Sequence, residues 1–172
     1  LSAPVGESAY NVLRWNGATW CAPGNGMGGS YPRPFVLALG VFSGELTAVG
    51  YFTSAGDVSA SHIARGDGTS WQPLGGGMNS HVFALGDYDG ELIAGGMFTA
   101  AGVGAAKGIA RWDGTTWWPL GDGMSGPTYP YVYALTVYDG ELIAGGYFTS
   151  AGGTSANHVA RWDGTSWRPL GT

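Results

Sequence analysis

The 172-residue chain contains little cysteine and little charge. Cys21 is the single cysteine, so an intrachain disulfide is impossible. Charged residues make up 11% of the chain, the formal net charge is −5 and no basic run occurs, which argues against nucleic acid as a partner. No apolar run approaches the roughly 18 residues that a spanning helix needs, so we expect no membrane span. The three histidines, His62, His81 and His158, are too few and too scattered to indicate a metal triad.

The periodicity of a helix is also missing. No apolar stripe recurs at spacings of three and four residues, and glycine or proline interrupts every window. What the chain has instead is an internal repeat. The text from Val132 to Gly171 occurs twice more upstream, lightly edited, and its last third occurs a fourth time. A repeat this clear decides the architecture before any single residue does.

Each repeat is typical of four short strands. In the last copy the apolar runs are Val132–Tyr138, Glu141–Phe148, His158–Trp162 and Ser166–Leu170. The Asp139-Gly140 pair between the first two runs predicts a hairpin with a type I′ turn. Pro169 in the fourth run lacks a backbone donor, which favours an edge strand. The repeat therefore predicts a four-stranded antiparallel meander.

A meander of about 45 residues cannot bury both of its faces alone, but copies that pack face to face around an axis can. We therefore expect an all-β fold, a β-propeller made of four-stranded antiparallel blades, with about three and a half blades in this chain. The expected divisions are residues 1–24 for the second half of a blade, 25–75 for blade one, 76–121 for blade two and 122–172 for blade three. Propellers close with about four to eight blades, so we expect either further chains or a longer repeat array to complete the ring.

The repeat resembles a known family in three features: Gly145-Gly146 after an apolar strand, then Trp162, then Trp167 before Pro-Leu-Gly. These features and their copies resemble Kelch-type propeller repeats over nearly the whole chain. The spacing of five residues between the two tryptophans is tighter than the family usually shows. The Asp-Gly-Thr-Ser-Trp text also resembles the Asp box of sialidase propellers, in which another residue separates Asp from Gly. Here Asp163 and Gly164 are adjacent, so the Kelch-like interpretation is favoured.

Tryptophans recur at fixed positions in the repeat, namely Trp15, Trp20, Trp71, Trp112, Trp117, Trp162 and Trp167. Aromatic residues in fixed register favour a role in the core between blades, although a stacking platform for sugars is the alternative. Gly66 replaces the aromatic residue in one copy and would leave a notch. The arginines and glutamates that recur are interpreted as one structural contact per blade: Arg14, Arg65, Arg111 and Arg161 with Glu45, Glu91 and Glu141.

The segments that break the repeat indicate where a ligand would bind. In a meander, the second turn and the link between blades share one edge, so the variable links and the loops Asp57–Ser61, Val103–Lys107 and Gly153–Asn157 gather on one face. The proline-stiffened segments around Tyr31 and Tyr129 suggest an aromatic patch, or else a packed crossover between blades. The candidate binding residues are Tyr31, Arg33, Asp57, His62, His81, Lys107, Tyr129, Tyr131 and His158.

No catalytic residue, cofactor or metal site is expected. The Asp87, Asp89 and Glu91 text resembles a calcium loop, but a hairpin turn explains it and it supplies too few of the six to eight oxygens that calcium takes. Neither a nucleophile–base set nor an unrepeated carboxylate pair stands out. Kelch-like propellers include a copper oxidase, whose convergent Tyr, His and Cys set cannot be placed here.

The leading hypothesis is a non-enzymatic binding module, outside the cell or on its surface, that recognises a glycan or a protein through loops on one face. The alternative is a structural repeat unit that assembles with other copies of itself, because an uncovered sheet edge templates another chain. An enzyme is the third hypothesis. The expected partners are therefore other copies or the rest of a longer repeat chain, and a glycan or protein ligand.

Overall fold

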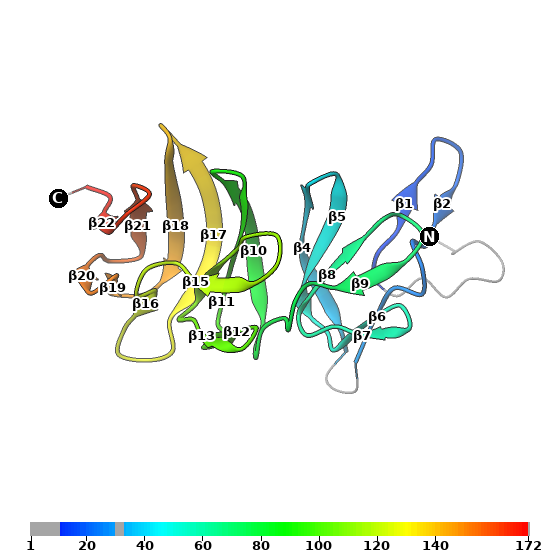
Figure 1. Cartoon of the computed structure of the whole chain (residues 1–172), viewed down its shortest axis with the longest axis horizontal. Helices are drawn as coiled ribbons and strands as arrows, with labels where there is room; N and C mark the ends of the chain where they lie inside the picture. The colour runs from blue at the N-terminus through cyan, green and yellow to red at the C-terminus, as the bar shows by residue number, and fades with distance from the viewer. Residues whose placement is uncertain (1–10, 30–32, 172) are drawn as a thin grey trace.

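The computed structural model describes residues 11–29 and 33–171, and these fold entirely as β-strands and turns (Figure 1). Three four-stranded antiparallel sheets follow one another, each with its strands in chain order. The first contains β4 (Phe35–Phe42), β5 (Glu45–Tyr51), β8 (Ile63–Gly66) and β9 (Trp71–Pro73). The second contains β10 (Val82–Tyr88), β11 (Glu91–Gly96), β14 (Ile109–Trp112) and β15 (Trp117–Pro119). The third contains β17 (Tyr131–Tyr138), β18 (Glu141–Tyr147), β21 (Val159–Trp162) and β22 (Trp167–Pro169).

These three sheets are propeller blades, and we refer to them as blades one, two and three. In each, the strand that contains proline lies at the edge of the sheet, as the sequence predicts. The first strands β4, β10 and β17 are the parts of successive blades that approach each other most closely, so they form the inner edge of the assembly. A separate hairpin, β1 (Arg14–Trp15) with β2 (Trp20–Cys21), forms the described part of the half blade.

The segments of small residues between the second and third strands are not plain loops, as the sequence led us to expect, but two-residue strands. They are β6 (Ser54–Ala55) with β7 (Val58–Ser59), β12 (Ala100–Ala101) with β13 (Gly104–Ala105), and β19 (Ser150–Ala151) with β20 (Thr154–Ser155). The links between blades pair with them through β3 (Met27–Gly28), the Met78–Ala101 bridge and β16 (Met124–Ser125). Backbone pairing with the link orders these segments, and all of them lie at the lower end of the molecule in Figure 1.

The first turn of each blade has the geometry that the Asp-Gly text predicts. Asp139 and Gly140 have φ of 53° and 75°, which is the double positive φ of a type I′ turn. The last turn is different, because Asp163 folds its own side chain into it: Oδ1 accepts the backbone N–H of Thr165 at 2.9 Å and of Ser166 at 2.8 Å. Asp67 and Asp113 do the same in the other blades.

Each first strand contains a β-bulge at the same place. The register shifts between Val82 and Ala84 opposite the glycine pair of β11, so Phe83 has no direct partner in the ladder. Leu37 and Tyr133 occupy the same position in blades one and three. A bulge leaves one residue unpaired and redirects its side chain. Here it displays one large side chain per blade along the inner strands.

The contact that joins successive blades is made by a buried tryptophan. The indole Nε1 of Trp71, Trp117 and Trp167 donates to the carbonyl of Pro23, Leu74 and Leu120 of the preceding unit, at 2.6, 2.9 and 2.9 Å. All three side chains are buried in separate inter-blade cores, so the core interpretation is confirmed for them. It is wrong for Trp15 and Trp20, whose side chains are 52% and 44% exposed. No described blade precedes the half blade, and these two rings pack on each other with centroids 5.5 Å apart.

The recurring arginine and glutamate also form the single contact per blade that the sequence predicts. Arg65 pairs with Glu45 at 3.0 Å, Arg111 with Glu91 at 2.5 Å, and Arg161 with Glu141 at 3.2 Å. Each pair joins the third strand of a blade to the start of its second strand and is partly exposed. Ion pairs of this kind contribute about 1 kcal/mol or less, so they select strand register more than they stabilise the fold.

Gly96→Val and Gly146→Val should each lower the free energy of unfolding by about 3 kcal/mol or more, because strand register must shift to admit a side chain. A Cβ at Gly96 would overlap the His81 carbonyl, and one at Gly146 would overlap the Tyr131 carbonyl. Gly104→Val is the matched control, since its Cβ would meet nothing closer than 3.8 Å and the equivalent residue of blade one is Val58. Chemical denaturation measures the free energy of unfolding of the three variants. Equal stability of all three would contradict the expectation.

Trp117→Ala should cost on the order of 3–5 kcal/mol, because it removes a buried ring and leaves the Leu74 carbonyl without its donor. Trp20→Ala changes the equivalent but exposed residue and should cost roughly 1 kcal/mol or less. Thermal or urea melts of the two variants measure the difference. Similar losses for both would show that the two tryptophans do not differ in their contacts.

Candidate functional site

A continuous series of aromatic and imidazole rings crosses all three blades at one end of the inner strands. Successive ring centroids lie 4.2–6.5 Å apart. We call this series the aromatic strip; its members are Phe35, Tyr51, His62, His81, Phe83, Tyr131, Tyr133, Tyr147 and His158. Contacts at this spacing are typical of offset and tilted aromatic packing.

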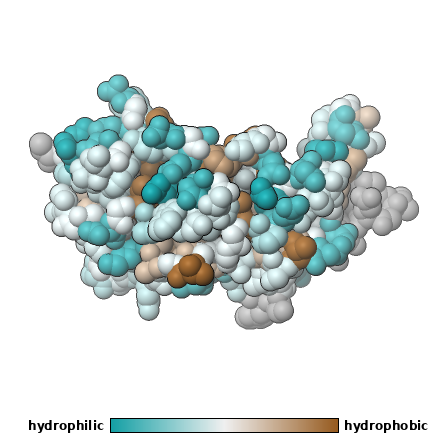
Figure 2. Space-filling model, viewed as in Figure 1, coloured by the Kyte–Doolittle hydropathy of each residue, from teal (hydrophilic) through white to brown (hydrophobic). Residues whose placement is uncertain are grey.

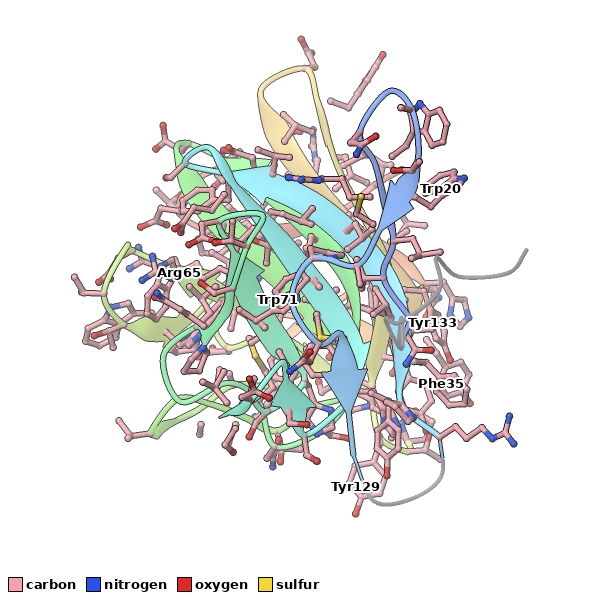
Figure 3. The ribbon with its side chains drawn as sticks, turned by 90° about the vertical axis from the view of Figure 1, so that its right-hand side faces the viewer. Trp20, Phe35, Arg65, Trp71, Tyr129 and Tyr133 are labelled. Atoms are coloured by element: carbon pink, nitrogen blue, oxygen red, sulfur yellow. The ribbon has the colours of Figure 1, made fainter. Side chains whose placement is uncertain are left out.

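Repeat-equivalent positions build the strip. Phe35, His81 and Tyr131 stand at or just before the start of the three first strands, while Phe83 and Tyr133 are the bulge residues two positions later. The remaining rings come from the end of the second strand and the start of the third: Tyr51 and His62 in blade one, Tyr147 and His158 in blade three. These positions share the end of the blades that carries the small hairpins. Figure 3 shows Phe35 and Tyr133 along the side of the molecule opposite Arg65.

The tightest part of the strip lies at the junction of blades one and two. Tyr51 stacks on His81 with centroids 4.2 Å apart, and on His62 at 5.6 Å. His62 is buried, with 8% of its surface exposed, and its Nδ1 has no hydrogen-bond partner among the described residues. A buried polar atom without a partner is unfavourable, so packing against Tyr51 and His81 contributes to holding this ring in place.

The backbone φ angle is positive at His62 (65°) and at His158 (67°). The same repeat position has Asn11 at 70° and Gly108 at 71°, so the left-handed conformation belongs to the fold. Glycine adopts this conformation at the lowest cost, and blade two uses it. Blades one and three place histidine there instead, which puts two rings into the strip at some cost in backbone energy.

The two central imidazoles are biased toward their neutral form. Burial lowers the pKa of His62, and repulsion from His81 lowers it further, while the Gly50 carbonyl opposes the shift. Burial also lowers the pKa of His81. No lysine, arginine, aspartate or glutamate belongs to the strip. It is an aromatic surface edged by a few polar ring atoms and hydroxyls.

The structure brings four of the predicted site residues into the strip, namely His62, His81, Tyr131 and His158. Tyr129 and Arg33 are exposed and lie two residues before the strip members Tyr131 and Phe35; Figure 3 shows Tyr129 on the same side as Phe35 and Tyr133. Tyr31 falls outside the described residues.

Asp57 and Lys107 belong to the small hairpin regions instead. Asp57 Oδ1 accepts a hydrogen bond from Asn25 Nδ2 at 2.8 Å, which ties the hairpin tip to the link. The Lys107 side chain is exposed, and its carbonyl accepts the N–H of Met124 at 2.9 Å. Neither contact joins the strip.

Sequence reasoning missed five strip members: Phe35, Tyr51, Phe83, Tyr133 and Tyr147. The signal was present, because aromatic residues recur at the start of the first strand and after the glycine pair. Strict alternation along each first strand would fix the face of its sheet on which Phe83 or Tyr133 lies. The bulge breaks that alternation, and it was not foreseen.

The other cavities are weaker candidates for a binding site than the aromatic strip. A cavity of about 450 Å³ between blades two and three is lined by Tyr88, Asp89, Glu91, Arg111 and Trp162, and its one arginine already pairs with Glu91. Within residues 11–29 and 33–171, no group of three side chains is arranged to hold a metal ion. The same part of the chain contains no helix long and apolar enough to cross a membrane. Figure 2 shows that the face seen in Figure 1 is mostly hydrophilic or neutral, with apolar residues in small separate patches.

Comparison with known families agrees with this architecture. Residues 139–162 match a family model described as a domain of unknown function (DUF5122) beta-propeller. The matched stretch begins at the first turn of blade three and ends with its third strand, β21. Blades one and two repeat the same text and the same strand pairing, so the chain is a protein of propeller blades. No curated protein matches the chain.

The lowered pKa values of His62 and His81 predict a loss of stability in mild acid. The unfolded chain binds protons near the ordinary histidine pKa of about 6.5, before the folded chain does, so the free energy of unfolding falls as the pH drops below that value. The melting temperature should therefore be lower near pH 5 than near pH 7. The turn aspartates contribute little in this window: hydrogen bonds lower their pKa values in the folded chain, but the unfolded carboxyls take up protons only near their ordinary pKa of about 3.9, so that part of the pH dependence falls at lower pH.

His62→Asn is the matched variant, because Asn11 already adopts the same positive φ at the equivalent position. It should reduce the difference in melting temperature between the two pH values while leaving the fold intact. Thermal melts at both pH values measure this. An undiminished pH dependence would exclude His62 as one of its sources.

Proposed function

We propose that this chain is a non-enzymatic, Kelch-like propeller module that binds its ligand on the aromatic strip. The observation that carries the proposal is the continuity of nine rings, drawn from three blades and four kinds of strand position, along a single end of the inner strands. The double glycine, the aromatic residue that ends the third strand in blades two and three, and the Trp before Pro-Leu-Gly support the Kelch-like assignment. Rings that only served the core would be covered, whereas Phe35, Tyr133 and Tyr147 are exposed.

A neutral glycan is the ligand class that the strip suits best. The faces of sugar rings present polarised C–H groups, which pack favourably on the electron-rich face of an aromatic ring. The tyrosine hydroxyls and imidazole nitrogens at the edges supply donors and acceptors for sugar hydroxyls. The absence of charged members disfavours anionic ligands. A protein segment rich in apolar side chains is the second ligand class.

The ionisable groups support binding rather than catalysis. Asp67, Asp113 and Asp163 have low pKa values because each accepts hydrogen bonds within its own turn. Glu91 is engaged with Arg111. The lowered pKa values of the three turn aspartates therefore have a structural explanation that needs no catalytic role.

The extracellular or cell-surface setting is part of this proposal, since a lectin-like module meets its glycans there. An antibody against the protein should label intact cells of the source organism. Labelling only after the cells are made permeable would exclude that setting.

Tyr133→Ala should weaken glycan binding at least tenfold without lowering stability, because the ring is 55% exposed and its neighbours Phe83 and Tyr131 remain. Trp118→Ala is the control, since Trp118 is similarly exposed but lies on the outer strand β15 away from the strip. A glycan array identifies ligands, and calorimetry then compares the variants. Loss of binding in both variants, or in neither, would remove the strip from the binding site.

Assembly with further copies is a second candidate function, and the blade junction supports it. Each internal junction joins a tryptophan to the carbonyl of a leucine or proline in the preceding unit. At the two ends of the described chain the partners are separated: Trp20 is exposed, and Leu170 is 49% exposed although its equivalents Leu74 and Leu120 are buried. A head-to-tail contact between two copies would join them.

Trp20→Ala and Leu170→Asp should therefore each reduce self-association, which light scattering over a range of protein concentrations detects. Trp118→Ala again serves as the control for an exposed aromatic residue elsewhere. A wild-type chain that stays monomeric throughout that range would rule out this candidate.

A further inference from the structure

The cavity between blades two and three lies at the opposite end of the first strand from the aromatic strip. The strip members His81 and Phe83 stand at the start of β10, whereas Tyr88 ends that strand and lines the cavity. Its volume of about 450 Å³ lies within the range of small-molecule sites, which is about 300–1,000 Å³. Blade two supplies one wall, and Trp162 and Gly164 of blade three supply the other. A ligand there would bind independently of the strip.

The charged groups of the cavity include one carboxylate in excess. Arg111 Nη1 donates a hydrogen bond to Glu91 Oε1 at 2.5 Å, so these two charges match each other. Asp89 also lines the cavity, is exposed and makes no ion pair with a described residue. Its φ of 53° belongs to the tight first turn of blade two, which fixes the position of this residue at the rim. The charge of Asp89 is therefore free to pair with a cation.

The Tyr88 hydroxyl lies in a negative electrostatic potential. It reaches the last turn of blade three, where a Cβ added to Gly164 would lie 3.6 Å from it. Burial raises the pKa of Tyr88, and the negative charges of Asp89, Asp163 and Glu141 raise it further. Asp163 and Glu141 also pair with arginines of blade three, so Asp89 remains the carboxylate available to a ligand. A negative potential favours a cation and disfavours an anion.

The remaining wall of the cavity is aromatic and apolar, and it includes Tyr88, Pro119, Leu120 and Trp162. The electron-rich face of an aromatic ring attracts a cation, and quaternary ammonium groups are recognised in this way. A primary ammonium group is compact and strongly hydrated, so it loses more on leaving water. A cation whose charge is spread over methyl groups therefore suits this wall best.

We propose that this cavity binds a quaternary ammonium group carried by a small molecule or a methylated side chain. Asp89 supplies the opposite charge at the rim, while the rings of Tyr88 and Trp162 contact the methyl groups. The Glu91–Arg111 pair closes the base of the site without adding net charge. The proposal concerns a second site and does not rest on the ligand of the aromatic strip.

The chain itself offers matched variants for a test. Blade one has Ser43 at the position of Asp89, and its φ of 51° is nearly the same, so Asp89→Ser should keep the turn. Asp139→Ser is the control, because it removes the same charge from the equivalent turn of blade three, where φ is also 53°. Asp139 does not line this cavity. Asp89→Asn is a second variant, since Asn-Gly also favours a type I′ turn.

The test titrates choline into the full 172-residue chain and follows the amide signals by NMR spectroscopy. Saturable shifts should appear at Tyr88, Asp89 and Trp162. Asp89→Ser should raise the dissociation constant at least threefold, whereas Asp139→Ser should leave it within twofold. Dimethylbutanol, the uncharged carbon analogue of choline, should bind at least threefold more weakly than choline.

The Tyr133→Ala chain should bind choline as the wild type does, which separates this site from the aromatic strip. A parallel titration with acetylated trimethyllysine amide distinguishes the two sources: tighter binding of choline indicates a small molecule, and the reverse order a methylated side chain. Absence of saturable shifts with both compounds would overturn the proposal. So would equal weakening by Asp89→Ser and Asp139→Ser, or binding of dimethylbutanol as tight as that of choline.

Discussion

The hydrogen bond from a buried indole to a carbonyl of the preceding unit is the interaction on which the rest of the structure depends. A single meander of this repeat buries only one face at a time, so it needs a neighbour in a defined position. The indole of Trp117 gives that position, because its ring fills the inter-blade core while its N–H reaches one particular atom, the Leu74 carbonyl. Repetition at Trp71 and Trp167 stacks the blades in the same orientation each time.

The second constraint is the close approach between the glycine pair and the first strand. At Gly96 and Gly146 the neighbouring backbone leaves no room for a side chain, and the same place contains the bulge of the first strand. The bulge turns Phe83 and Tyr133 out of the ladder, toward rings that come from the ends of other strands. The packing of the blade thus helps to produce the aromatic strip. The glycines that leave room for the first strand and the bulge residues that join the strip lie opposite each other in the same β-bulge.

Some contacts need two adjacent blades, or both halves of the same blade. Where the described chain contains only one of the two parts, the contact is incomplete. Arg14, Trp20 and Leu170 each occupy a position whose equivalents are paired or buried elsewhere in the described chain. The internal copies therefore define what each open position would contact. Repeat proteins allow this inference because each unit interacts mainly with its nearest neighbours.

The sequence by itself determined the repeat, the four strands of each blade, the type I′ turns, the edge position of the proline strand and the pairing of Arg65 with Glu45, because each follows from local propensity or from close recurrence. It also placed four members of the strip, His62, His81, Tyr131 and His158, among the candidate binding residues. Only the tertiary structure decided that Trp15 and Trp20 are exposed while Trp112 and Trp117 are buried, since a described blade precedes the second pair and not the first. The strip as a whole was likewise decided by the bulges and by the positive φ of His62, which are backbone features that arise when strands pair and blades pack.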